Sequence, residues 1–171
     1  MIPQHKIETL SKLDGIILVG GPSGSGKTTF SQAIVDHEIK LSLDVHANKF
    51  YRTDAKSIFN KEYGNGILFL EFATDTLISS LEIKACKDLL ARLNEITPIL
   101  HCINVEIPPK TAFTRYLSRM RGMQYLHIGK LKKLIQYTNG SNIHQGNRNW
   151  LELMSILGIA TTTINGLRVS N

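Results

Sequence analysis

Eight residues near the start of the chain, Gly21-Pro22-Ser23-Gly24-Ser25-Gly26-Lys27-Thr28, have the composition of a loop that binds phosphate. They fit the pattern G-x-x-x-x-G-K-[ST]. Glycines let the backbone bend tightly, so that its N–H groups can surround an anion. A lysine ammonium group then neutralises the outer phosphates, and a threonine hydroxyl is the expected ligand of Mg²⁺. The run therefore predicts a loop that holds a triphosphate and Mg²⁺.

The flanking residues predict the strand–loop–helix context that this pattern requires. Gly15–Val19 is a short apolar run typical of a buried strand, and Thr29–Val35 has the composition of the first turns of a helix. The N–H groups that open the helix add their dipole at the same place. The alternative is a glycine-rich turn that matches by accident. We expect the nucleotide-binding residues to be Gly21, Pro22, Ser23, Gly24, Ser25, Gly26, Lys27, Thr28 and Thr29.

Apolar runs and helical periodicity alternate along the rest of the chain, which must position this loop. Strands are expected at Ile16–Gly20, Ile39–Leu43, Ile67–Phe72, Ile99–Val105 and Ile159–Ile164. The alternation predicts a single domain over residues 1–171 with an α/β fold, in which three α/β/α layers enclose a five-stranded parallel sheet. In such sheets ligands lie at the carboxyl ends of the strands, where the loop is also expected.

Two segments do not follow this alternation. Residues 45–66 are polar, basic and aromatic, and we interpret them as an excursion from the sheet that holds a second substrate, or as a plain surface connection. Residues 108–149 form a basic region after Pro108-Pro109, for which a lid is one interpretation. Within it, residues 139–142 and 144–149 suggest loops before a helix that begins near Trp150.

The positive charge is concentrated in the second half of the chain. The net charge is +6, but residues 1–106 hold 11 basic and 13 acidic side chains, whereas residues 107–171 hold nine and one. Such a block attracts phosphates. Three interpretations remain for this block: it binds nucleic acid, it binds a nucleotide, or it is a solvated basic face without a ligand. Cys86 and Cys102 are expected to be buried thiols in a reducing compartment, and the composition predicts a cytoplasmic protein without a membrane span.

In the order of its elements the chain resembles the P-loop NTPase superfamily, in particular the nucleoside and nucleotide kinases. The resemblance rests on Gly21–Thr28 and on the strand Ile99–Val105, which is followed by Pro108-Pro109 and a helix with Arg115 and Arg119. In these kinases such a helix belongs to a lid over the phosphates. The resemblance implies that Arg115 and Arg119 contact the transferred phosphoryl group and neutralise its charge. A basic helix face in water is the alternative.

The same resemblance suggests roles for acidic residues at strand ends. Asp44 is expected to act as general base or to steer Mg²⁺, with a turn cap as the alternative. Glu71 stands where these kinases place a second acid near Mg²⁺. They more often have aspartate there, so Asp75 is the substitute. Thr28 and Glu71 are therefore the expected metal ligands, and Lys27, Asp44, Arg115 and Arg119 the expected catalytic residues.

These expectations favour an ATP-binding protein that acts as a Mg²⁺-dependent kinase on a small-molecule acceptor. The alternatives are an ATP-binding protein or ATPase that acts on a partner or nucleic acid through its basic half, and a nucleotide-binding module without chemistry. The chain lacks the Asn-Lys-x-Asp motif of guanine-specific GTPases. It also lacks the acceptor motifs of guanylate, shikimate, gluconate and adenylylsulfate kinases, so the sequence predicts no particular acceptor.

Overall fold

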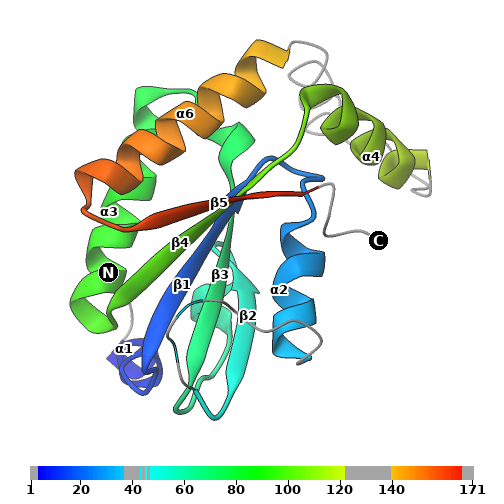
Figure 1. Cartoon of the computed structure of the whole chain (residues 1–171). Helices are drawn as coiled ribbons and strands as arrows, with labels where there is room; N and C mark the ends of the chain where they lie inside the picture. Colours follow the sequence, from blue (N-terminus) through cyan, green and yellow to red (C-terminus); the bar gives the residue numbers. More distant parts are fainter. Residues whose placement is uncertain (1–3, 37–42, 44, 46, 122–139, 167–171) are drawn as a thin grey trace.

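The five strands form one parallel sheet in the order β2-β3-β1-β4-β5 (Figure 1). The computed structural model describes residues 4–36, 43, 45, 47–121 and 140–166, without the side chains of residues 116, 119–121 and 141. The strands are β1 (Gly15–Gly21), β2 (Phe50–Asp54), β3 (Ile67–Ala73), β4 (Ile99–Glu106) and β5 (Thr161–Asn165). The predicted five-stranded parallel sheet is thus confirmed.

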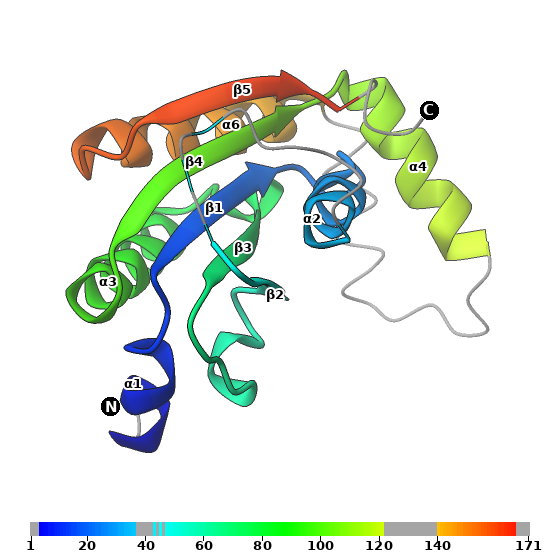
Figure 2. The same ribbon diagram turned by 60° about the horizontal axis from the view of Figure 1, so that its bottom comes forward.

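Helices cover both faces of this sheet (Figure 2). One face carries α2 (Lys27–Val35), and the opposite face carries α3 (Ser80–Ile96) and α6 (Gly140–Ile156). The remaining elements are the helices α1 (Gln4–Leu10) and α4 (Pro109–Arg121) and the 3₁₀ turns η1 (Ile58–Asn60) and η2 (Thr74–Thr76). The arrangement is the predicted three-layer α/β/α fold.

The alternation of side chains along β1 explains why the sheet needs cover on both faces. Ile16 and Leu18 pack in the cluster under α3 and α6, whereas Ile17 and Val19 pack in the cluster under α2. Every residue of β1 is buried, as is typical of a central parallel strand. The outer strand β5 differs, because four of its five residues are exposed.

Two sequence-based boundaries were wrong. β2 is formed by Phe50–Asp54, inside the segment that was expected to leave the sheet. Its polar residues suit an edge strand, where only one neighbour supplies hydrogen bonds, and this polarity concealed it. The strand expected at Ile39–Leu43 lies outside the described residues except for Leu43, which is not in a strand. α6 begins at Gly140, so residues 144–149 are helical rather than a loop.

The order of the strands sends the connections that follow β1 and β4 in opposite directions. From β1 the chain passes through α2 to β2 on one side, whereas from β4 it continues through α4 and α6 to β5 on the other. Neighbouring parallel strands whose connections diverge in this way form a topological switch point, which is where ligands bind in open α/β sheets.

Trp150 fixes α6 against this end of the sheet. Its side chain is fully buried, and its ring lies 5.1 Å from that of Phe72 between centroids. The indole also lies directly over Gly20, where an added Cβ atom would overlap it. Gly20 therefore has to lack a side chain for α6 to pack here. In the described part of the chain, no helix has the length and apolar character needed to cross a bilayer.

Candidate phosphate-binding site

The predicted phosphate-binding loop connects the carboxyl end of β1 to the first turn of α2. Gly24 and Gly26 have φ angles of 84° and 94°, in the left-handed region that glycine adopts without strain. Gly26 is the N-cap of α2, so the N–H groups of the first turn follow directly after the loop. Backbone donors and the positive end of the helix dipole therefore occur together, as an anion site requires.

Lys27 folds back over this loop. Its Nζ donates hydrogen bonds to the carbonyl oxygens of Gly21, at 2.7 Å, and Pro22, at 2.9 Å. The side chain is buried, although it comes from the first residue of α2. The ammonium group is thus held beside the turn that the loop makes after β1, where a phosphate chain in the loop would meet it.

Glu71 at the end of β3 connects the loop helix to the sheet. Its Oε2 accepts a hydrogen bond from the Thr28 hydroxyl at 2.7 Å, and its Oε1 accepts one from the Ser31 hydroxyl at 2.6 Å. Arg52 forms an ion pair with Oε1 at 2.9 Å. β3 pairs with β1 in a register that sets Glu71 opposite Val19, near the loop. The two residues expected to bind Mg²⁺ are therefore in direct contact.

Asp75, the substitute for Glu71 in the sequence-based expectation, has a different position. Its carboxylate accepts hydrogen bonds from the Ser23 backbone N–H at 2.9 Å and from the Ser23 hydroxyl at 3.1 Å. It is nearly fully buried in η2. Asp75 therefore restrains the first half of the loop, whereas Glu71 is the acid that contacts Thr28.

The first two turns of α4 pack against the loop. Arg115 Nη1 donates to the carbonyl oxygen of Gly24 at 3.2 Å and, more weakly, to that of Gly166 at 3.5 Å. A Cβ atom on Gly24 would come within 3.2 Å of the Ala112 carbonyl oxygen. Arg115 is therefore beside the loop, and its expected contact with a phosphoryl group stays a prediction. The predicted Asp44 and the side chain of Arg119 lie outside the described residues.

A pocket of about 530 Å³ opens on the other side of Glu71, between the ends of β2 and β3 and helix α3. Apolar side chains form most of its wall, and Asp54, Glu71 and Glu82 are also lining residues. The Glu71 carboxylate itself is engaged by Thr28, Ser31 and Arg52 on the α2 side of the sheet. Burial raises the pKa of the Cys86 thiol in this wall to about 12, so the thiol stays neutral. Hydrogen bonds from Ser79 lower the pKa of Glu82, which stays ionised.

Sequence reasoning did not find Ser31 or the partner of Arg52. Ser31 follows Lys27 by four residues, a spacing that places the two on the same side of a helix, but no motif includes it. Arg52 lies within residues 45–66, where the sequence predicts an excursion from the sheet or a surface connection. Its pairing with Glu71 depends on the β2–β3 register, in which Arg52 lies opposite Phe69.

The geometry defines a class of architecture, a doubly covered parallel sheet with a glycine-rich loop at its switch point. Comparison with known proteins adds no family to this description. A scan of the sequence against protein-family models found no match, and a search of the curated proteins found no significant similarity.

Proposed function

We propose that this protein belongs to the P-loop NTPase superfamily and binds a nucleoside triphosphate, ATP, with Mg²⁺ at residues 21–29. The contact between Thr28 and Glu71 carries the proposal, because it joins a hydroxyl and a carboxylate at the junction of the loop and α2. Hydroxyl and carboxylate oxygens are suitable ligands for Mg²⁺. The left-handed glycines and the helix N-terminus beside them suit the phosphates.

Each residue of the site has a distinct part in this proposal. The backbone of the loop binds the phosphate chain, and Lys27 moves from its two carbonyl contacts to the outer phosphates. Thr28 and Glu71 would hold Mg²⁺, which supplies positive charge next to the phosphates when bound. Glu71 already has Arg52 as a counter-charge, so its carboxylate remains an acceptor without a buried, uncompensated charge.

We further propose that the reaction is transfer of the γ-phosphoryl group to a small-molecule acceptor. Arg115 supports this reaction, since a guanidinium group beside the loop can neutralise charge that develops in the transition state. The pocket between β2, β3 and α3 supports it as well, because it offers a space for an acceptor at the same end of the sheet as the loop. Its volume of about 530 Å³ lies in the range of small-molecule sites.

The test measures nucleotide binding and ADP release by the full chain, with Mg²⁺, alone and with a panel of hydroxyl-bearing metabolites. Lys27→Ala should abolish binding and turnover, because the phosphate chain loses its ammonium partner. Lys87→Ala is the matched control, since Lys87 is exposed on α3 and has no part in the loop. Unchanged ATP affinity in Lys27→Ala would remove the proposal.

The assay also separates the kinase from the two alternatives. A kinase releases ADP faster with one member of the panel. An ATPase that acts through the basic half of the chain is stimulated by DNA or RNA, and this stimulation weakens as salt is raised. Binding of ATP without any ADP release would favour a nucleotide-binding module without chemistry.

A further inference from the structure

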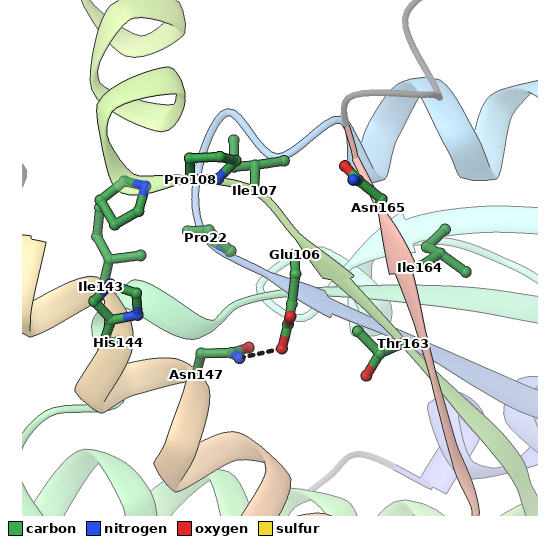
Figure 3. A pocket seen from close by; sticks show the side chains of 11 residues that line it. Pro22, Glu106, Ile107, Pro108, Ile143, His144, Asn147, Thr163, Ile164 and Asn165 are labelled. Atoms are coloured by element: carbon green, nitrogen blue, oxygen red, sulfur yellow. Dashed lines mark hydrogen bonds between the residues drawn. The ribbon is translucent and has the colours of Figure 1, made fainter.

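A second pocket, with a volume of about 520 Å³, lies at the carboxyl ends of β4 and β5 beside α6 (Figure 3). Its wall includes Pro22 from the phosphate-binding loop, so a ligand in it would be a neighbour of that loop. The volume is sufficient for a small metabolite. Among the described residues that line this pocket there is one acid, Glu106, and there is no lysine or arginine.

Only one carboxylate oxygen of Glu106, Oε1, accepts hydrogen bonds from side-chain amides of the described residues. Its Oε1 accepts a hydrogen bond from Asn147 Nδ2 at 2.9 Å, drawn as the dashed line in Figure 3, and another from Asn104 Nδ2 at 3.3 Å. The carboxylate therefore sets the orientation of both amides, because a reversed amide would point its oxygen at a negative charge. Oε2 of Glu106 remains as an acceptor that can face a ligand.

The orientation of the two amides leaves their oxygens without donors. Asn104 is fully buried, and the Oδ1 atoms of Asn104 and Asn147 are both buried with no hydrogen-bond partner among the described residues. Buried carbonyl oxygens of this kind are costly unless a donor reaches them. The cluster thus contains acceptors without donors in the described part of the chain, and two of its three residues, Glu106 and Asn147, line the pocket.

We propose that this pocket binds the primary ammonium group of a small molecule through Glu106 and Asn147. An ammonium group offers three N–H donors and a positive charge, which complement the Oε2 acceptor of Glu106, the carboxylate that Asn147 holds in place. A guanidinium fork fits less well, since it favours both carboxylate oxygens and Oε1 is already occupied by two amides. A divalent metal ion fits less well too, because the described residues of this pocket offer one carboxylate and, unlike at the proposed Mg²⁺ site of Thr28 and Glu71, no triphosphate is proposed here to complete the ligand set.

The remaining walls suit the carbon skeleton of such a molecule. Ile107, Pro108 and Ile143 form an apolar side, and Thr163 from β5 adds a hydroxyl opposite them. The ligand class is therefore a small amine with a short apolar or hydroxylated body. The proposal does not depend on nucleotide binding by the loop, because the acceptors belong to β4 and α6.

The experiment follows the side-chain amide resonances of the asparagines in ¹⁵N–¹H spectra of the full chain while 2-aminoethanol is added. We expect saturable shifts of the Asn147 and Asn104 NH₂ signals. Choline is the matched probe, because it carries the same positive charge without an N–H donor, and it should cause no such shifts. Mg²⁺ and Ca²⁺ alone should leave these signals unchanged.

Glu106→Gln removes the charge and should weaken 2-aminoethanol binding about tenfold or more, since hydrogen bonds to charged groups are the strong ones. Glu152→Gln is the control, because it makes the same change at an exposed position of α6 outside the pocket. If Glu106→Gln does not fold, Asn147→Ala takes its place and should weaken binding as well. Absence of amine-dependent shifts, equal shifts with choline, binding of a divalent ion instead, or binding that survives these substitutions would each overturn the proposal.

Discussion

Two acidic residues near the carboxyl ends of β3 and β4, on either side of β1 in the sheet, have opposite surroundings. Glu71 lies near the end of β3 and has both carboxylate oxygens engaged, by Thr28, Ser31 and Arg52. Glu106 ends β4 and has one oxygen engaged, by two amides whose own oxygens lack partners among the described residues. β1 lies between the two strands, so both acids flank the predicted phosphate-binding loop.

This difference suggests that the same end of a sheet can hold one group of side chains that stabilises the fold and another that is suited to binding. The Glu71 side is a closed network, in which each polar group supplies what its neighbour needs, and removal of a member leaves the others unsatisfied. The Glu106 side contains oxygens without hydrogen-bond donors in the part of the chain that the structure describes, so it should contribute little to the free energy of unfolding when no ligand is bound. Substitutions on the two sides should therefore differ in their effect on stability.

The largest effect is expected for Glu71→Ala. The change leaves Arg52 without its partner and two hydroxyls without an acceptor, so we expect the free energy of unfolding to fall by about 3 kcal/mol. If Mg²⁺ is held here, turnover should fall about 100-fold. Urea unfolding and steady-state kinetics measure both. A stability equal to that of Glu106→Ala would contradict the contrast between the two sides.

Arg115→Ala should lower kcat about tenfold, with a smaller change in nucleotide affinity, because in the proposed reaction this arginine acts mainly on the transition state. The variant also tests whether α4 acts with the Glu71 side of the loop. Arg148→Ala is the control, since Arg148 is exposed on α6. An unchanged kcat would exclude Arg115 from the reaction.

The pH dependence of stability at alkaline pH tests how tightly the buried cysteines are packed, including Cys102 of β4. Burial raises the pKa of Cys86 and Cys102 from an ordinary value of 9.0 to about 12. Above 9.0 the unfolded chain releases these thiol protons and the native chain keeps them, so stability falls between these two pH values.

At about pH 10 each thiol should lower the free energy of unfolding by about 1.4 kcal/mol relative to about pH 8. Urea melts of the protein and of Cys102→Ala at the two pH values measure the contribution of β4. The variant should lose about half of the thiol effect. The same pH dependence in both proteins would show that Cys102 ionises in the folded state.

A smaller effect is expected for Arg52→Ala, about 1 kcal/mol of stability, because the side chain is 31% exposed and solvent screens part of the ion pair. The change removes a counter-charge of Glu71 but keeps its two hydroxyl donors. The thermal unfolding midpoint should therefore shift less than in Glu71→Ala. A shift as large as that of Glu71→Ala would mean that the ion pair dominates this network.

The smallest effect is expected for Asn147→Ala, a change in stability of less than about 0.5 kcal/mol. The substitution deletes one hydrogen bond to Glu106 and, with it, an amide oxygen that has no partner. Removing a hydrogen bond together with an unpaired buried oxygen can leave the free energy of unfolding nearly unchanged. Urea unfolding without ligand measures this change, and destabilisation by several kcal/mol would show that the Glu106 side is structural.

The sequence predicted what local chemistry alone determines. The central strands β1, β3 and β4 were visible as apolar runs because their residues are buried on both faces, and residues 21–28 were visible because the loop is contiguous. β2 was missed because an edge strand tolerates polar residues. The start of α6 was missed because the residues before Trp150 are polar and include Gly146, which packs against Thr74 and Asp75.

Tertiary contacts determine the rest of the candidate site, and no local pattern encodes them. Asn147 and Glu106 are 41 residues apart and meet only because α6 returns over β4. Arg52 reaches Glu71 only through the pairing of β2 with β3. The proposed roles of Thr28 and Glu71 remain predictions, although the structure places the two side chains in contact.

The position of Trp150 gives the molecule an optical reporter of its own. It is the sole tryptophan of the chain, and its indole lies over Gly20, immediately before the loop, and against Phe72, which follows Glu71. Its emission therefore originates at one defined place between the ends of β1 and β3. Movement of either strand end should change the intensity without any attached dye, so fluorescence titration can follow events at the loop in the unmodified protein.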